Sequence, residues 1–162
     1  GRKGQALEDY KALLLQLNNE VAAQAPADLA INTHVCRGNY HSTFFSSGAY
    51  DGVADLLFGE ENVNAYYLEY DDERSGGFAP LAKVSGDKKV VLGLVTTKSP
   101  VLEKKEDVIA RIYEAAKYVP LDRLYLSPQC GFASCEIGNK LTEEEQWAKL
   151  KLVKEIAEEV WK

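Results

Sequence analysis

The chain has 162 residues, of which 46% are hydrophobic and 27% are charged, and its formal net charge is −6. This length suits one ordinary domain with its own hydrophobic core. The acidic balance disfavours a nucleic-acid partner, because phosphates require a basic surface. No apolar run approaches the length of a membrane span, and no secretory signal is visible. We therefore expect a cytoplasmic protein that binds neither nucleic acid nor a membrane.

The three cysteines are an odd number. Without a secretion signal, they indicate a reducing compartment with metal or thiol chemistry rather than a disulfide framework. The chain begins at Gly1 and contains no methionine. For this reason we expect it to be part of a longer polypeptide.

The first half of the chain predicts a helix followed by alternating strands and helices. Apolar residues spaced by three or four predict an amphipathic helix over residues 5–25. A short β-branched run predicts the first strand at 29–33, and the long polar loop 37–49 separates it from a short helix at 50–58. An aromatic and β-branched stretch predicts the second strand at 63–69.

The second half continues the alternation. After a short helix at 78–84, a continuously apolar run predicts the third strand at 90–95, buried on both faces. A helix is expected over 103–119, and the fourth strand over 123–127. The last helix, at 141–161, begins with a capping box. Its expected inner face consists of Trp147, Leu150, Val153, Ile156, Ala157 and Val160.

Alternating strands and helices predict an α/β fold with a parallel sheet and right-handed crossovers. Four such units with helices on one side would form half of an eight-stranded barrel. That half would leave one face and two sheet edges uncovered, so an absent half or a second copy would have to cover them. A small doubly wound sheet is the alternative fold.

Four side chains that bind metals lie at the predicted C-terminal strand ends, where the chemistry of parallel sheets is concentrated. His34 and Cys36 are two residues apart, so in an extended chain they point to the same side. Glu69 closes the second strand, and Cys130 lies in a loop after the fourth. One imidazole, two thiols and one carboxylate make a complete tetrahedral zinc shell.

Other interpretations stay open at these positions. A histidine and a cysteine alone are commonly buried core residues. Cys135 competes with Cys130, and His41 competes with His34, although both lie farther from a strand end. The acidic run before Arg74 could be a solvated surface, and Arg74 could pair with those acids or bind a substrate carboxylate.

The wording around these ligands resembles a known family. Thr-His-Val-Cys at 33–36, Tyr-Leu-Glu at 67–69 and Ser-Pro-Gln-Cys-Gly at 127–131 resemble the C-terminal catalytic barrel of cobalamin-independent methionine synthase. The resemblance extends from Ile31 almost to the end of the chain, and it is greatest to the shorter, single-barrel relatives. It implies that His34, Cys36, Glu69 and Cys130 hold zinc. It also matches Arg74 and Ser75 to an Arg-Ser pair, here taken as substrate-binding.

The resemblance implies the C-terminal half of a TIM (β/α)8 barrel, with residues 1–162 as a single domain whose N-terminal half is absent from this chain. It also implies methyl transfer from 5-methyltetrahydrofolate polyglutamate to homocysteine, which forms methionine. The anionic shell suits this chemistry, because an electron-rich zinc is a weak Lewis acid that leaves a bound thiolate reactive. The alternatives are a methyltransferase for another thiol or methyl donor, and a catalytically inactive half-barrel. No residue is assigned as the proton donor.

Overall fold

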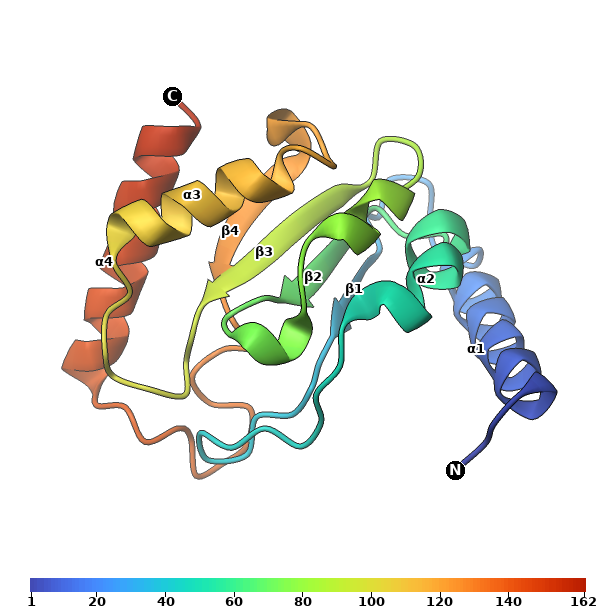
Figure 1. Cartoon of the computed structure of the whole chain (residues 1–162), viewed down its shortest axis with the longest axis horizontal. Helices are drawn as coiled ribbons and strands as arrows, with labels where there is room; N and C mark the ends of the chain where they lie inside the picture. Colours follow the sequence, from blue (N-terminus) through green and yellow to red (C-terminus); the bar gives the residue numbers. More distant parts are fainter.

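A parallel sheet of four strands organises the chain (Figure 1). The computed structural model describes all residues from Gly1 to Lys162. The strands are β1 (Asn32–Val35), β2 (Ala65–Glu69), β3 (Lys89–Val95) and β4 (Leu124–Pro128). The α-helices are α1 (Gln5–Ala22), α2 (Ala54–Glu60), α3 (Lys105–Ala115) and α4 (Glu143–Val160). No helix combines the length and the apolar character needed to cross a membrane.

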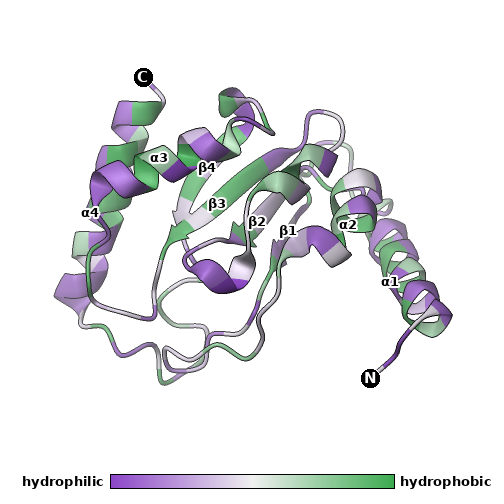
Figure 2. Ribbon diagram, viewed as in Figure 1, coloured by the Kyte–Doolittle hydropathy of each residue, from purple (hydrophilic) through white to green (hydrophobic).

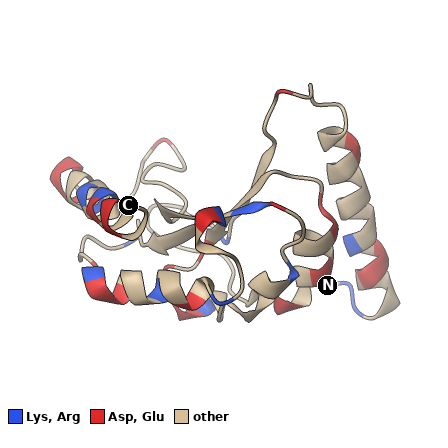
Figure 3. Cartoon of the chain, turned by 90° about the horizontal axis from the view of Figure 1, so that it is seen from above, with Lys and Arg blue, Asp and Glu red and all other residues tan.

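The strands lie in the order β1-β2-β3-β4, and every neighbouring pair is parallel. Each crossover connection therefore leads to the next strand in the same direction. Because crossovers share one handedness, they all lie on the same face of the sheet. Figure 1 shows α2 and α3 in front of the sheet, and Figure 3 shows acidic and basic residues distributed along the helices. The α/β prediction is confirmed, and the doubly wound alternative is wrong, because the strand order never reverses.

The hydrophobic core lies between the sheet and α2, α3 and α4. Six of the seven residues of β3 are buried, as the continuously apolar sequence predicted. Figure 2 shows most of β3 in the colour of hydrophobic residues. The buried cluster includes Tyr50, Phe58, Tyr66, Leu92, Val108, Ile112, Leu124 and Ile156. Helices α3 and α4 pack against the strands and hold them in place. The side chains at the strand ends therefore have fixed positions.

The opposite face of the sheet is partly open. Tyr67 of β2 and Tyr125 of β4 are each 42% exposed there, although neighbouring side chains on the same strands are buried. A hollow of about 740 Å³ lies at the edge where the strands begin, and apolar residues such as Ile31 and Val91 line part of it. The sequence predicts an uncovered face of this kind, and what covers it stays a prediction.

The first helix and strand differ from the sequence expectation. The first strand is Asn32–Val35 rather than 29–33, so His34 lies inside it and Cys36 directly follows it. Helix α1 ends at Ala22 and buries no residue, although its apolar stripe predicted an inward face. It contacts mainly α2, where the side chain of Asn18 donates a hydrogen bond of 2.9 Å to Glu61.

The last helix was predicted at 141–161 and is observed at Glu143–Val160, but its predicted inner face is partly wrong. Trp147 is 60% exposed, and Lys149 is fully buried in its place. The ammonium of Lys149 donates to the carbonyl of Val101 at 2.8 Å and to both carboxylate oxygens of Glu103. Glu103 also accepts the backbone N–H of Thr96 at 2.9 Å. This ion pair attaches α4 to the loop after β3, and a hydrophobicity pattern cannot show it.

Candidate metal centre

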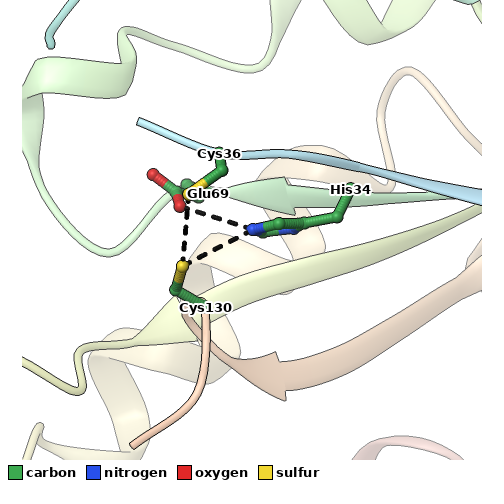
Figure 4. A group of neighbouring side chains, drawn as sticks. All are labelled: His34, Cys36, Glu69 and Cys130. Carbon is green, nitrogen blue, oxygen red and sulfur yellow. Dashed lines mark hydrogen bonds and ion pairs between the residues drawn. The ribbon is translucent and has the colours of Figure 1, made fainter. Parts of the chain in front are cut away.

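The four predicted ligands converge at the C-terminal edge of the sheet. His34 lies in β1, Cys36 directly follows it, Glu69 ends β2, and Cys130 lies in the turn after β4 (Figure 4). One ligand atom from each of these residues lies within 4.8 Å of all the others. Three strands that are separated in the sequence thus contribute to one point in space.

The distances among these atoms are those of hydrogen bonds to sulfur and of an ion pair. The Sγ atoms of Cys36 and Cys130 are 3.3 Å apart, and Sγ of Cys130 lies 3.6 Å from Nε2 of His34. The same Nε2 lies 3.7 Å from Oε1 of Glu69. Edges of this length are close to those of a tetrahedron whose centre lies about 2.0–2.3 Å from each ligand, as around zinc.

The backbone selects the tautomer of His34. Its Nδ1 lies 3.1 Å from the carbonyl oxygen of Tyr67. A carbonyl can only accept a hydrogen bond, so Nδ1 carries the proton of the neutral ring and Nε2 keeps its lone pair. That lone pair faces the cluster, which is the usual arrangement of a metal-ligating histidine.

Glu69 is fully buried and only half satisfied by the protein. Its Oε2 accepts the backbone N–H of Arg37 at 3.1 Å. Its Oε1, which faces His34, has no hydrogen-bond partner. A buried carboxylate oxygen without a partner is costly, and a dication at the centre of the cluster would supply what is missing.

The sulfur atoms indicate which metal would fit. The Cys36 Sγ accepts the N–H of Gly38 at 3.2 Å. Burial nevertheless raises the pKa of the Cys36 thiol above its ordinary value, and the neighbouring Cys130 acts in the same direction. A metal ion bound to these sulfurs would favour their thiolate form. Two sulfurs, one imidazole and one carboxylate suit zinc better than Mg²⁺ or Ca²⁺, which prefer all-oxygen ligands.

A cavity of about 470 Å³ opens beside the cluster, and His34, Cys130, Phe132 and Leu150 are among its lining residues. Most of its exposed lining is apolar, and two members of the cluster, His34 and Cys130, belong to it.

Arg37 is a residue of the site that the sequence interpretation missed. Its buried guanidinium donates to the carbonyl of Gly48 at 2.6 Å and to the hydroxyl of Tyr50 at 2.8 Å, and it lies over the Tyr50 ring. The Tyr50 hydroxyl in turn accepts the N–H of Glu69 at 2.9 Å. Arg37 therefore connects the first ligand loop to the strand that carries Glu69. Its position next to Cys36 was the only available signal.

Gln129 and Lys98 form a second supporting pair that the sequence did not indicate. Gln129 is buried, and its Oε1 accepts the ammonium of Lys98 at 2.5 Å and the hydroxyl of Thr97 at 3.2 Å. Burial lowers the pKa of Lys98. The loop after β3 supplies no metal ligand, but it holds the residue that precedes Cys130.

Arg74 and Ser75 lie beyond the cluster, in a 3-10 turn after β2. The guanidinium of Arg74 pairs with Asp71 at 2.8 Å and also with Asp72, and it lies 4.7 Å from the centre of the Phe44 ring. Of the two interpretations left open, pairing with the acids is the one observed. Ser75 is fully buried, and its hydroxyl has no hydrogen-bond partner. A role of either residue in substrate binding stays a prediction.

The two competing ligands lie outside the cluster. His41 donates from Nδ1 to the carbonyl of Gly138 at 3.0 Å and serves to join two loops. Cys135 is a free, half-buried thiol and is not among the converging side chains.

The fold and site together define a class: a parallel α/β protein with one histidine, two cysteines and one glutamate gathered at the C-terminal edge of its sheet, where they could hold a metal ion. The comparison with known families is specific. Residues 14–159 match the model of the cobalamin-independent synthase catalytic domain. The chain belongs to this family of cobalamin-independent methionine synthases, as the sequence motifs predicted.

Relatives among known proteins agree with this assignment. The chain is 52% identical over 160 residues to the uncharacterized protein YxjG of Bacillus subtilis. The match covers 98% of this chain and 42% of YxjG. It is 28% identical over 141 residues to the methionine synthase of Pyrococcus horikoshii, covering 77% of this chain and 38% of that enzyme. The chain thus spans about two fifths of the length of these curated relatives.

Solved structures confirm the barrel-type fold. A candidate vitamin-B12-independent methionine synthase from Listeria monocytogenes superposes with a TM-score of 0.75 at 40% identity, over 100% of this chain and 43% of that one. A B12-independent methionine synthase from Shewanella sp. W3-18-1, in complex with selenomethionine, gives a TM-score of 0.70 at 23% identity, over 95% of this chain and 43% of that one. The second likeness concerns the fold alone.

Proposed function

We propose that this chain carries the zinc-binding part of a methyltransferase that moves a methyl group from 5-methyltetrahydrofolate polyglutamate to the thiol of homocysteine, forming methionine. The observation that carries the proposal is the convergence of His34, Cys36, Glu69 and Cys130 within 4.8 Å. Membership of the family supports the reaction class.

The charge of the ligand set favours thiol alkylation over hydrolysis. Two thiolates, one carboxylate and one neutral imidazole carry a formal charge of about −3 against a +2 ion. When bound there, zinc would ionise an incoming thiol and keep it reactive as a thiolate. A hydrolase needs a more acidic zinc, which three neutral histidines typically provide.

The protein's own groups have separate tasks in this proposal. The Tyr67 carbonyl holds the proton of His34 on Nδ1, and the N–H of Arg37 holds one oxygen of Glu69. The N–H of Gly38 directs the Cys36 sulfur. The cavity beside Cys130 would receive the acceptor thiol and exclude water along its apolar wall. Arg74 and Ser75 would contact the substrate only if the pairing of Arg74 with Asp71 rearranges.

We further propose that residues 1–162 form a single domain that makes up part of a larger barrel. The exposed Tyr67 and Tyr125, and the hollow that both help to line, support a partner for the open face of the sheet. A missing half-barrel, or a second copy of the chain, would cover this face. A reducing compartment such as the cytoplasm would keep the free thiols available for zinc.

Metal analysis with matched cysteine variants tests the site. Wild type and Cys135→Ala should each bind one equivalent of zinc, whereas Cys36→Ala and Cys130→Ala should lose most of it. Cys135→Ala is the matched control, because it removes a free thiol outside the cluster. Equal zinc content in all four proteins would contradict the proposed ligand set.

Methyl transfer should then be measured for the zinc-loaded chain, alone and with a separately produced N-terminal half of a relative such as YxjG. Methionine formed from homocysteine and methylfolate, and abolished by Cys130→Ala, supports the proposed reaction. Transfer only to other thiols, or only from other methyl donors, would favour a different methyltransferase. Zinc binding without transfer in either mixture would favour an inactive half-barrel, which the open sheet face makes the second candidate.

A further inference from the structure

The turn that carries Cys130 has an unusual backbone conformation. Cys130 has a φ of 58°, and the following Gly131 has a φ of 105°. A left-handed conformation is uncommon for a cysteine, and such positions persist where surrounding contacts determine them. Within the turn, the N–H of Gly131 donates to the carbonyl of Gln129 at 2.6 Å, and groups from elsewhere in the chain contact the turn as well.

Two asparagine side chains meet at the carbonyl oxygen of Gly131. Asn39 donates to it at 3.0 Å, and Asn139 donates to it at 3.4 Å. Asn39 also donates to the hydroxyl of Ser134 at 3.0 Å, and that hydroxyl lies 3.8 Å from the sulfur of Cys130. The carbonyl of the residue directly after the ligand is therefore held by two side chains.

Each asparagine belongs to a different part of the sheet edge. Asn39 lies three residues after Cys36, in the loop after β1, and only 8% of it is exposed. Asn139 also donates to the carbonyl of Thr97 at 2.6 Å, in the loop after β3. The contacts at Gly131 thus connect the ends of β1, β3 and β4.

The loop that presents Asn39 is itself fixed. Gly38 has a φ of 99°, and a Cβ there would lie 2.7 Å from the backbone nitrogen of Phe45. The same loop continues to Ser42, whose hydroxyl accepts the N–H of Lys140 at 2.9 Å. One segment therefore provides the Cys36 ligand and, through Asn39, the support for the other thiol.

We propose that Asn39 and Asn139 are positioning residues that clamp the Cys130–Gly131 turn, so that the Cys36 loop sets the separation of the two sulfurs. The clamp would give the metal site its shape before a metal binds, and this consequence rests on the proposed function. The clamp itself concerns the protein without metal. The third residue of the Cys-Arg-Gly-Asn motif after Cys36 thereby gains a role distinct from ligation.

The first test compares Co²⁺ and zinc binding by wild type, Asn39→Asp and Asn19→Asp. Aspartate keeps the shape of asparagine but has no N–H to donate. Asn19 is the matched control, because it also bridges two segments, donating to the Glu60 carbonyl at 3.1 Å and accepting the N–H of Asn62 at 2.6 Å. Asn39→Asp should weaken zinc binding about 10- to 100-fold, the usual effect of losing a group that orients a ligand. It should also weaken the sulfur-to-cobalt charge-transfer band, because Cys130 is held less firmly.

The second test measures hydrogen exchange of the backbone at residues 129–135 in the metal-free proteins. Asn39→Asp should speed exchange there at least tenfold, whereas Asn19→Asp should leave it unchanged. Should Asn39→Asp fail to fold, Asn139→Asp and the milder Ser134→Ala replace it, with smaller effects of the same sign. Unchanged exchange and an unchanged cobalt spectrum in the clamp variants would overturn the inference. If wild type binds no zinc or Co²⁺ but Asn39→Asp still speeds exchange at residues 129–135, the clamp is supported and the proposed function is refuted.

Discussion

Replacing Glu69 by glutamine should change stability in opposite directions without and with metal. The Glu69 carboxylate is fully buried, and its Oε1 has no hydrogen-bond partner although it faces Nε2 of His34 at 3.7 Å. A glutamine side chain would keep the oxygen that accepts from Arg37. Its NH₂ would point toward the lone pair of His34 and could donate to it. The glutamine would thus have hydrogen-bond partners for both of its polar atoms, whereas Oε1 of Glu69 has none.

The magnitude follows from the cost of an unsatisfied buried polar group, which is about 1–3 kcal/mol. Since part of that cost is recovered by relaxation, we expect metal-free Glu69→Gln to be about 1–2 kcal/mol more stable than wild type. For a chain of 162 residues, each kcal/mol raises the melting temperature by about 3 °C. Zinc affinity should fall by more than about a hundredfold, because a neutral amide replaces an anionic ligand.

The assay is thermal and urea unfolding of both proteins, with a chelator and with excess zinc. Glu69→Gln should be the more stable protein in chelator and the less stable one in zinc. Glu61→Gln is the control, since Glu61 is also a buried carboxylate but lies at the opposite edge of the sheet, against α1. It should leave the response to zinc unchanged. A Glu69→Gln protein that is less stable than wild type in chelator would refute the reasoning.

Three further predictions concern other parts of the chain. Burial raises the pKa of Glu61, so the folded state gains stability as pH falls through that raised pKa. Urea unfolding should show that Glu61→Gln stabilises the protein at pH 7 and does so less at pH 5. The same free-energy difference at both pH values would contradict this. Gly93→Ala should cost about 1–3 kcal/mol in urea unfolding, because its Cβ would lie 2.7 Å from the carbonyl of Leu68; a neutral effect would show that the strands separate freely. Zinc at a hundredfold excess over its dissociation constant should stabilise wild type by about 2.7 kcal/mol, and magnesium should not; a melting temperature indifferent to zinc would argue against a metal centre.

The strands and the ligands could be predicted from the sequence because both depend on local patterns. A buried strand such as β3 is a continuous apolar run, and parallel strands bring their C-terminal ends to one edge. Residues at three such ends therefore had to lie near one another. The resemblance then added the ligand identities, and the structure brings the same four side chains together.

What escaped prediction depends on contacts between distant residues. The inward side of α4 includes Lys149, because Glu103 lies opposite it, and no periodicity of apolar residues can reveal such a pair. The stripe of α1 predicted burial, but the helix contacts mainly α2 and its apolar side chains stay exposed. Arg37 looked like an ordinary polar loop residue, although it is buried against Tyr50. A sequence pattern shows which face is apolar, but not which partner is present.

Strand β3 illustrates how an element without a ligand can shape a metal centre. It lies between β2 and β4, so the separation of Glu69 from the Cys130 turn depends on what β3 places between them. Gly93 pairs with Glu69 in the sheet, and a Cβ there would lie 2.7 Å from the Leu68 carbonyl and 3.3 Å from Cα of Gln129. The missing side chain allows both neighbours to approach, and the N–H of Gln129 then bonds to the carbonyl of Val95 at 2.7 Å. The absence of a side chain at Gly93 therefore helps to bring Glu69 and the Cys130 turn close together.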